Sequence, residues 1–327
     1  MAKMKAAIFV EPGRIILGEK PLPDVGPTDA LIKITTTTIC GTDVHILKGE
    51  YPVESGLTIG HEPVGTIEKL GSLVSGFSEG DRVIAGAITP CGQCFSCLGG
   101  HSAQCGDKPM GVWRFGNTID GSQAEYLLVP DAIANLTQVP DSLTDAQVLM
   151  CPDIMSTGFA GAESGNIQIG DVVAVFAQGP IGLCATAGAR LRGASRIIAV
   201  ETVPERIAMS RQLGVDVSIE ALGLQQTFEA ALRVLKPGGT LSSLGVYSGE
   251  LTMPIEAIAA GLGDHKIVTS LCPGGKERMR RLINIVESGR VDLRPLVTHH
   301  YTLDDIETAY ELFSQQRDGV LKIAITP

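Results

Sequence analysis

The clearest hydrophobic pattern in the chain lies between residues 172 and 200. The run "VVAVF" at 172–176 is continuously apolar, as is typical of a buried strand, and the Gly-Pro pair at 179–180 opens an apolar helix that continues to about Leu191. A second apolar run at 196–200 predicts the next strand. Two strands joined by a helix form a βαβ unit, so we expect a doubly wound α/β fold of the Rossmann type.

The pattern of the remaining chain predicts further elements on both sides of this unit. "ALIKITTTTI" at 30–39 is typical of a strand, and so are "VDVSIEAL" at 215–222 and "KIVTSLC" at 266–272. The segment 228–246 predicts a helix, a turn and a strand. Two amphipathic helices are expected at 275–292, ending at Gly289, and at 302–319, beginning at Thr302.

One βα unit is missing from the predicted sheet. After the helical segment "ERIAMSRQLG", Gly214 is followed at once by the strand at Val215, although a parallel crossover requires a dozen or more residues. Strand order 3-2-1-4-5-6 places the missing third strand at an edge, so the central strands can still pair. Either the chain itself is shortened here, naturally or deliberately, or a disordered segment on the order of 25 residues was left out and the remaining residues were renumbered. We favour the second explanation, because a helix that passes directly into a strand is sterically demanding.

Length and composition indicate two domains. The chain has 327 residues, of which 44% are hydrophobic, enough for two moderate cores. We expect a β-rich catalytic domain made of residues 1–155 and 296–327, and a nucleotide-binding domain made of residues 156–295.

The charge of the chain excludes several partner classes. A net charge of −10 without a basic block predicts no positively charged surface for nucleic acid or anionic membranes. Small neutral or cationic ligands remain compatible with this charge. The N-terminal apolar run ends at Glu11 and is too short for a signal peptide. The longest apolar stretch, from Val172, contains Gln178 and the Gly-Pro pair, so we expect no membrane span and a cytoplasmic protein.

Four of the eight cysteines lie within fifteen residues, in "CGQCFSCLGGHSAQC". Cytosolic thiols are kept reduced, so two disulfides in this loop are not expected. Four thiolates on a glycine-containing loop satisfy tetrahedral zinc, and a closed site of this kind is structural. The alternative, four unliganded hydrophobic residues, does not explain why they cluster in a loop. His101 could replace one sulfur, but the four cysteines already complete the shell, which is formed by Cys91, Cys94, Cys97 and Cys105.

A second set of metal-binding residue types is dispersed along the chain. Cys40 follows the strand at 30–39, His61 and Glu62 follow Gly60, and Asp153 lies in "LMCPDIMSTGFAGAE". Each is weak evidence alone, since a single buried cysteine is usually a core residue. Together one thiolate, one imidazole and one carboxylate leave a fourth position open, which is the pattern of catalytic zinc.

The βαβ unit carries a partial dinucleotide-binding motif. Gly179 permits close approach of a pyrophosphate to the helix N-terminus, and Gly182 allows tight packing of helix on strand. Ala177 replaces the first glycine of the usual motif. Glu201 ends the second strand, where a carboxylate accepts hydrogen bonds from the adenosine ribose and repels a 2′-phosphate, so NAD is expected over NADP. A strand–helix–strand unit that binds no nucleotide remains the alternative for this motif alone.

With these motifs in order, the chain resembles the zinc-dependent medium-chain alcohol dehydrogenases over nearly its whole length. "CGTDVH", "GHEPVGTI", "GDRV", "CGQCFSC" and "GPIGL" carry the resemblance. "PDIMSTGFAGAE" and "GVWRFGN" are most similar to the bacterial secondary-alcohol dehydrogenases, in which an aspartate is the third zinc ligand. That subgroup often lacks the structural-zinc cysteines that this chain has.

The resemblance implies a fold, a cofactor and a role for each matching residue. It implies a GroES-like catalytic domain beside the Rossmann domain, NAD, one catalytic and one structural zinc, and a homotetramer. Catalytic zinc would be bound by Cys40, His61 and Asp153, with Glu62 as a transient ligand, and Thr42 and His45 would pass the alcohol proton to solvent. Trp113 would line the substrate pocket. The cofactor would contact Gln178, Gly179, Pro180, Ile181, Glu201, Arg206, Ala221, Leu222, Gly245, Val246, Tyr247 and Lys322.

The function expected from these features is the interconversion of secondary alcohols and ketones by hydride transfer. Three alternatives remain. A zinc-free quinone reductase of the same fold should lack Cys40, His61 and Asp153 together. A polyol- or threonine-type dehydrogenase would use the same chemistry on another substrate. A nucleotide-binding relative without turnover is made more plausible by the missing βα unit.

Overall fold

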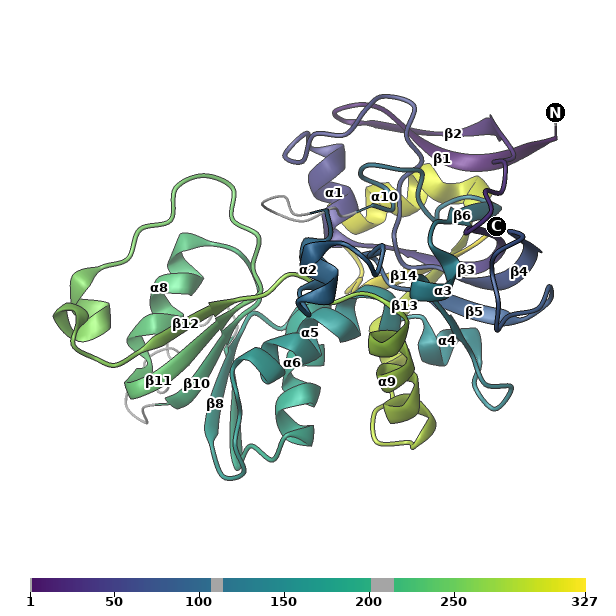
Figure 1. The fold of residues 1–327 in the computed structure, drawn as a ribbon. Coiled ribbons are helices and arrows are strands. Elements are labelled where there is room, and N and C mark those ends of the chain that lie inside the picture. The colour runs from purple at the N-terminus through teal and green to yellow at the C-terminus, as the bar shows by residue number, and fades with distance from the viewer. Residues whose placement is uncertain (1, 107–113, 201–214) are drawn as a thin grey trace. The chain divides into compact units, whose positions relative to one another are not determined.

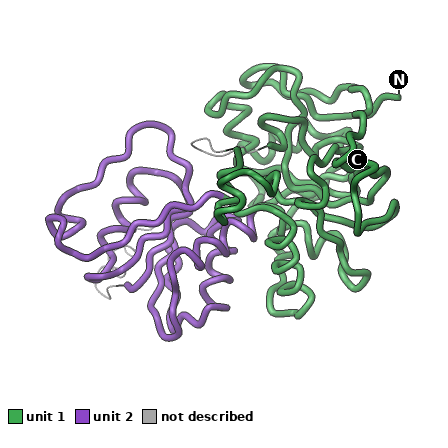
Figure 2. Tube along the Cα trace, in the orientation of Figure 1, with its two compact units in different colours: residues 1–153, 272–327 green, residues 154–271 purple. Residues whose placement is uncertain are grey.

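The computed structural model describes residues 2–106, 114–200 and 215–327. These residues form two compact units, one of residues 1–153 and 272–327 and the other of residues 154–271 (Figure 2). The sequence predicts domain boundaries at 155/156 and 295/296. In the structure, residues 272–295 group with the first unit rather than with the second. No helix in the described part of the chain is long and apolar enough to cross a membrane.

The first unit is built on a seven-stranded sheet in the order β13-β14-β3-β4-β5-β7, with β6 also paired to β3 (Figure 1). A separate hairpin of two antiparallel strands precedes it. The strands of this unit are β1 Lys3–Glu11, β2 Arg14–Pro21, β3 Ala30–Ile39, β4 Val64–Leu70, β5 Arg82–Ala85, β6 Tyr126–Val129, β7 Leu136–Gln138, β13 Val297–Thr302 and β14 Lys322–Thr326. Its helices are α1 Gly41–Leu47, α2 Phe95–Leu98, α3 Ala132–Asn135, α4 Asp145–Val148, α9 Lys276–Glu287 and α10 Ile306–Ser314.

The long strand β3 joins distant parts of the sequence. Its residues 30–36 pair with β4 and its residues 30–33 with β6, and its last residues pair antiparallel with β14, so that Ile39 lies opposite Ile323. The C-terminal strand therefore lies beside the residue that precedes Cys40. This pairing places Lys322 next to the end of β3.

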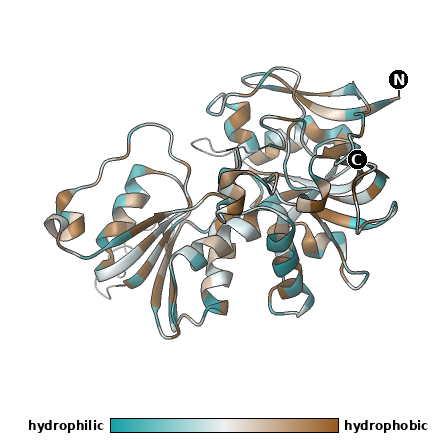
Figure 3. Cartoon of the chain, viewed as in Figure 1, coloured by the Kyte–Doolittle hydropathy of each residue, from teal (hydrophilic) through white to brown (hydrophobic). Residues whose placement is uncertain are grey.

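Helix α9 explains why the first unit includes residues 272–295. Its apolar residues Met279, Leu282, Ile283 and Val286 are buried, while the face toward the viewer in Figure 3 is hydrophilic. Thr137 on β7 donates a hydrogen bond to the Lys276 carbonyl at 2.9 Å. The sequence predicts this amphipathic helix, but the spacing of its apolar residues does not show which unit it packs against.

The second unit is a five-stranded parallel sheet in the order β12-β11-β10-β8-β9. Its strands are β8 Val172–Phe176, β9 Arg196–Val200, β10 Val215–Glu220, β11 Leu235–Ser243 and β12 Lys266–Thr269, and its helices are α5 Ser156–Ser164, α6 Pro180–Leu191 and α8 Gln225–Arg233. The predicted βαβ unit is confirmed, with β8 and β9 at the expected residues. Within the described ranges no strand lies outside β9, as the missing βα unit requires.

Short helical turns complete both units. They are η1 Ser102–Gln104, the π-helical turn η2 Cys151–Met155, η3 Ile255–Gly261, η4 Arg294–Leu296 and η5 Leu303–Asp305. The helix expected from Thr302 begins as η5 and continues into α10, and the strand expected at 266–272 ends at Thr269. The expected helix "ERIAMSRQLG" lies outside the described residues.

Candidate active site

Cys40 is fixed at the junction of β3 and α1. Its backbone is extended (φ −110°, ψ 158°), and α1 begins at the next residue. Asp43, at the third position of the helix, accepts a hydrogen bond from the Cys40 N–H at 2.9 Å, as in a capping box. The thiol is therefore held at the start of a helix, and it is buried.

His61 lies in a turn that depends on a glycine. Gly60 has φ +94°, and a Cβ there would lie 2.6 Å from the Gln123 side chain. The turn is bonded to residues 121–123: Ser122 N–H donates to the Gly60 carbonyl at 2.9 Å and Gln123 N–H to the Ile59 carbonyl at 3.0 Å. A side chain at residue 60 would thus displace the segment that positions His61.

Asp153 is presented by the π-helical turn η2, a feature that is frequent at functional sites. The Ala87 N–H donates to the Pro152 carbonyl at 3.0 Å, which ties the turn to the residues after β5. The buried Cys272 thiol lies 3.8 Å from the Asp153 carbonyl oxygen. These contacts hold the backbone of the turn that carries Asp153.

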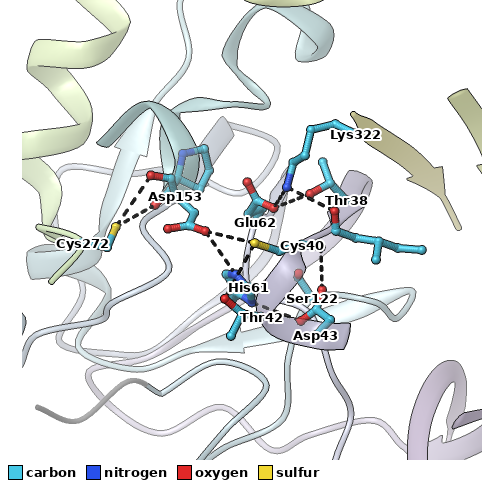
Figure 4. A network of polar contacts seen from close by, with 12 residues as sticks. Thr38, Cys40, Thr42, Asp43, His61, Glu62, Ser122, Asp153, Cys272 and Lys322 are labelled. Carbon is cyan, nitrogen blue, oxygen red and sulfur yellow. Dashed lines mark hydrogen bonds and ion pairs between the residues drawn. The ribbon is translucent and has the colours of Figure 1, made fainter. Parts of the chain in front are cut away.

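The structure brings together Cys40, His61, Glu62 and Asp153, which we call the metal centre (Figure 4). One ligand atom from each lies within 4.8 Å of the others. Asp153 Oδ2 is 3.4 Å from Cys40 Sγ and 3.3 Å from His61 Nε2. Zinc bonds of 2.0–2.3 Å give tetrahedral ligand separations of about 3.3–3.8 Å, so the three side chains fit zinc.

The imidazole of His61 lies between two carboxylates. Its Nδ1 is 3.3 Å from Asp43 Oδ1, and its Nε2 faces Asp153. Burial lowers the pKa of His61, but the charge of Asp43 and the hydrogen bonds to Asp153 and Asp43 raise it well above the usual value. A position that stabilises an imidazolium in this way also favours a metal cation, and a carboxylate behind a histidine ligand fixes its ring orientation.

Asp43 is in turn held by a buried chain of hydrogen bonds. Gln123 Nε2 donates to Asp43 Oδ2 at 3.1 Å and to the Thr38 carbonyl at 3.0 Å. The Tyr310 hydroxyl donates to Gln123 Oε1 at 2.8 Å. The chain connects α10, near the C-terminus, with the histidine of the metal centre, and each member is buried.

Glu62 belongs to the metal centre and to a buried ion pair. Its Oε2 accepts hydrogen bonds from Lys322 Nζ and the Thr38 hydroxyl, whereas Oε1 is buried and has no hydrogen-bond partner in the described part of the chain. Burial lowers the pKa of Lys322, but the charge of Glu62 outweighs it and keeps the ammonium protonated. The Lys322 ammonium also donates to the Ile39 carbonyl at 3.2 Å. Its expected contact with cofactor phosphates stays a prediction.

Helix α1 carries one hydroxyl beside the metal centre and, one turn further on, one imidazole. Thr42 Oγ1 is 3.8 Å from Cys40 Sγ. His45 is one turn further along the same helix, and residues three apart share a face. The His45 side chain is 45% exposed, so it reaches solvent while Thr42 lies beside the thiol.

The four cysteines of the loop 91–105 also converge, with their sulfurs within 4.8 Å of one another. Cys91 N–H donates to Cys105 Sγ at 3.2 Å and Gly106 N–H to Cys94 Sγ at 3.4 Å. The Gly106 hydrogen bond lowers the pKa of Cys94 to about 6, whereas burial raises the pKa of Cys97 to about 12. The donor set fits a closed tetrahedral zinc site.

The expected phosphate-binding turn in the second unit has the predicted geometry. Gly179 is the N-cap of α6 and has open space where a Cβ would be. At Gly182 a Cβ would lie 1.9 Å from the Ala177 carbonyl oxygen, so this residue must be glycine. Ala177, which replaces the first glycine of the motif, has φ +70°, a conformation that costs roughly 1–2 kcal/mol for an L-residue.

The ends of β10 and β11 are joined by a buried carboxylate that was not singled out from the sequence. Glu220 Oε1 accepts hydrogen bonds from the N–H groups of Leu222 and Gly223, both at 2.9 Å. Its Oε2 accepts from the Tyr247 hydroxyl at 2.6 Å. This contact orders the residues expected to border the cofactor, which are Ala221, Leu222, Gly245, Val246 and Tyr247.

Sequence reasoning missed the residues that hold the ligands in place. Asp43, Gln123 and Tyr310 come from three separate segments, and only Asp43 carries a signal, its position three residues after Cys40. The expected site residues Trp113, Glu201 and Arg206 lie outside the described residues.

Two family models match the chain. Residues 26–141 match the alcohol dehydrogenase GroES-like domain, and residues 192–319 match the zinc-binding dehydrogenase domain. An alcohol dehydrogenase of Cupriavidus necator is 65% identical, covering 100% of this chain and 99% of its own. The NADP-dependent isopropanol dehydrogenase of Thermoanaerobacter brockii is 35% identical, covering 98% of each chain.

Solved structures agree with these relatives. The zinc-dependent alcohol dehydrogenase 2 of Streptococcus pneumonia superposes with a TM-score of 0.89 at 32% identity, covering 99% of this chain and 98% of its own. The alcohol dehydrogenase TADH of Thermus sp. ATN1 gives a TM-score of 0.88 at 29% identity, covering 99% of each chain. The alignment with the Cupriavidus relative spans 363 positions, 36 more than the 327 residues of this chain. The relative therefore has at least 36 positions without a counterpart here, enough for a βα unit.

We predict that Cys94→Ser removes one zinc ion per chain and leaves the other. The serine hydroxyl cannot replace the thiolate in the closed site, and the melting temperature should fall by roughly 5 °C or more. Elemental analysis and thermal unfolding measure both quantities. Cys184→Ser, at a buried cysteine of α6, is the control and should keep the metal content. Unchanged zinc in Cys94→Ser would contradict the assignment.

We predict that Lys322→Met lowers the free energy of unfolding by about 3 kcal/mol, because it leaves the Glu62 carboxylate buried without its counter-ion. The double variant Lys322→Met/Glu62→Gln should recover part of this loss, since no unpaired charge then remains. Urea unfolding of the metal-free protein measures each value. Equal stability of the single variant and the wild type would show that the pair is not buried in solution.

Proposed function

The chain belongs to the zinc-binding alcohol dehydrogenases, and we propose that within this family it interconverts secondary alcohols and ketones. The observation that carries the proposal is the convergence of Cys40, His61 and Asp153 within one metal centre. The Thermoanaerobacter brockii relative is an isopropanol dehydrogenase, which supports a secondary alcohol as substrate. A zinc-free reductase would have no use for these three ligands.

The residues of the first unit suit the chemistry. Zinc at the metal centre would supply a Lewis acid for the substrate oxygen, and the nicotinamide would exchange the hydride. Thr42 accepts the proton of the substrate hydroxyl and passes its own proton on to His45. His45 is partly exposed and releases the proton to water. Asp43 keeps the His61 ring oriented, and Glu62 offers a second carboxylate through Oε1.

For the second metal site, we propose structural zinc bound by the four cysteines. The site is closed because four sulfurs complete a tetrahedron and leave no position for a substrate. The N–H groups of Cys91 and Gly106 that point at sulfurs support thiolate ligands.

For the cofactor, we propose NAD. Glu201 directly follows the last residue of β9, where a carboxylate suits the ribose hydroxyls and opposes a 2′-phosphate. The relatives from Thermoanaerobacter brockii and Entamoeba histolytica are NADP-dependent; the carboxylate of Glu201 is the reason for proposing NAD for this chain. The residues around Gly179 and Tyr247 would contact the dinucleotide.

A second candidate function is a nucleotide-binding protein without turnover. It is favoured by the five-stranded sheet, whose described part ends at β9, and by the 36 positions of the Cupriavidus relative that have no counterpart. Such a protein would keep both zinc sites and bind NAD but oxidise no alcohol. The homotetramer and cytoplasmic location implied by the resemblance stay predictions, and light scattering of the purified protein tests the first.

We predict that the purified protein oxidises 2-propanol or 2-butanol with two zinc ions per chain. His61→Gln should lose one zinc and lower kcat/KM by about 10³-fold, because the metal contributes several kcal/mol. Absorbance of the reduced nicotinamide and elemental analysis measure the two effects. His300→Gln, on the exposed face of β13, is the control. Two zinc ions without turnover on any alcohol would favour the second candidate.

We predict that kcat/KM is higher with NAD than with NADP. Glu201→Gly should lower the ratio of kcat/KM with NAD to kcat/KM with NADP by about tenfold or more, because it removes a charge that opposes the 2′-phosphate. A tenfold change corresponds to about 1.4 kcal/mol. Initial rates with both cofactors measure the ratio. A wild type equally efficient with NAD and NADP would overturn the assignment of Glu201.

A further inference from the structure

Helix α1 ends in a Schellman motif that joins His45 to Glu50. Lys48 is the C-cap, and Gly49 follows with φ +75°, a conformation that favours glycine. The Gly49 N–H donates to the Ile46 carbonyl and the Glu50 N–H to the His45 carbonyl, both at 2.9 Å. The second bond closes the motif between its first and last residues, so the side chains of His45 and Glu50 must lie close together.

In most Schellman motifs these two positions make a hydrophobic contact, but here a carboxylate faces an imidazole. Glu50 Oε2 bonds His45 Nδ1, and this hydrogen bond lowers the pKa of Glu50, which keeps its carboxylate ionised. The Tyr51 ring lies against the imidazole, with the ring centres 5.2 Å apart. The His45 ring is thus held by a carboxylate at one nitrogen and by an aromatic ring.

We propose that Glu50 is a positioning residue of the proton relay, which fixes the tautomer of His45. A carboxylate only accepts hydrogen bonds, so the imidazole must carry its proton on Nδ1. The lone pair is then on Nε2, and this nitrogen alone can accept a proton from the Thr42 side. The inference rests on the proposed function, because the relay has a role only if the protein ionises an alcohol.

The relay moves one proton along the side chains and returns each of them to its starting state. The substrate hydroxyl gives its proton to Thr42 Oγ1, and the Thr42 proton moves on to Nε2 of His45. The imidazole becomes an imidazolium whose Nδ1–H still bonds Glu50, and the Nε2 proton then leaves to water. Only protons move in these steps, so no group of the chain is oxidised or reduced. Glu50 stays a carboxylate throughout.

A surface ion pair without function would give the same contact, and such pairs contribute about 0–1 kcal/mol to stability. A positioning role and a contact without function predict different results for the tautomer of His45 and for turnover when Glu50 is replaced. Glu50→Leu removes the acceptor, whereas Glu50→Gln keeps a carbonyl oxygen that can still accept from Nδ1–H. Glu54→Leu removes a nearby exposed carboxylate outside the motif and serves as the control.

The test uses the full-length protein with ¹⁵N-labelled histidine and long-range ¹H–¹⁵N correlation at about pH 8.5, where imidazoles of ordinary pKa are neutral. The chain has six histidines, and His45→Gln assigns the signal of interest. Wild type, Glu50→Gln and Glu54→Leu should show the Nδ1–H tautomer. Glu50→Leu should show the Nε2–H tautomer that free histidine prefers.

Kinetics on the same proteins complete the test. Glu50→Leu should lower kcat/KM for 2-propanol by about tenfold, within the range of acid–base catalysis, and Glu50→Gln should stay within about twofold of wild type. An active wild type with the Nε2–H tautomer, or a Glu50→Leu variant with unchanged kcat/KM, would overturn the role proposed for Glu50. Neither result would contradict the proposed function. A wild type with no alcohol turnover would contradict the proposed function, and the relay with it.

Discussion

The structure of the first unit depends on how buried charge is balanced around Cys40. Three carboxylates, those of Asp43, Glu62 and Asp153, are buried there with the thiol of Cys40, and within the described residues the ammonium of Lys322 is the only permanent cation among them. Burying unpaired carboxylates costs several kcal/mol each, and Lys322 is already paired with Glu62. The divalent cation proposed for the metal centre, bound by the thiolate, the imidazole of His61 and one carboxylate, would balance the remaining negative charge. It would then support the local fold as well as the chemistry.

Much of this could be predicted from the sequence, for reasons that differ between elements. The strands at 172–176 and 196–200 were found because an unbroken apolar run between turn residues has few alternatives. The four cysteines were found because their spacing confines their sulfurs to one loop. Cys40, His61 and Asp153 were grouped because their residue types together suit catalytic zinc, and the family resemblance implied the same ligands; no local pattern links residues 113 positions apart.

The residues around the ligands could not be predicted in the same way. Gln123 and Tyr310 meet 187 positions apart, and their contact depends on how α10 packs in the folded unit. The pairing of Lys322 with Glu62 follows from the antiparallel register of β14 and β3, which a hydrophobic pattern alone does not set. Glu50 carried a local signal, a glycine at the end of a helix, but its meaning depends on which nitrogen of His45 it contacts. The grouping of residues 272–295 with the first unit was not predicted, because the amphipathic pattern of a helix shows which face is buried but not which domain buries it.

Anomalous diffraction from crystals of the protein, recorded on both sides of the zinc absorption edge, shows whether zinc occupies both sites. We expect two zinc peaks per chain, one among the four cysteine sulfurs and one at about 2.0–2.3 Å from Cys40 Sγ, His61 Nε2 and an Asp153 oxygen. A map with no peak between Cys40, His61 and Asp153, in a protein that still oxidises alcohols, would contradict it.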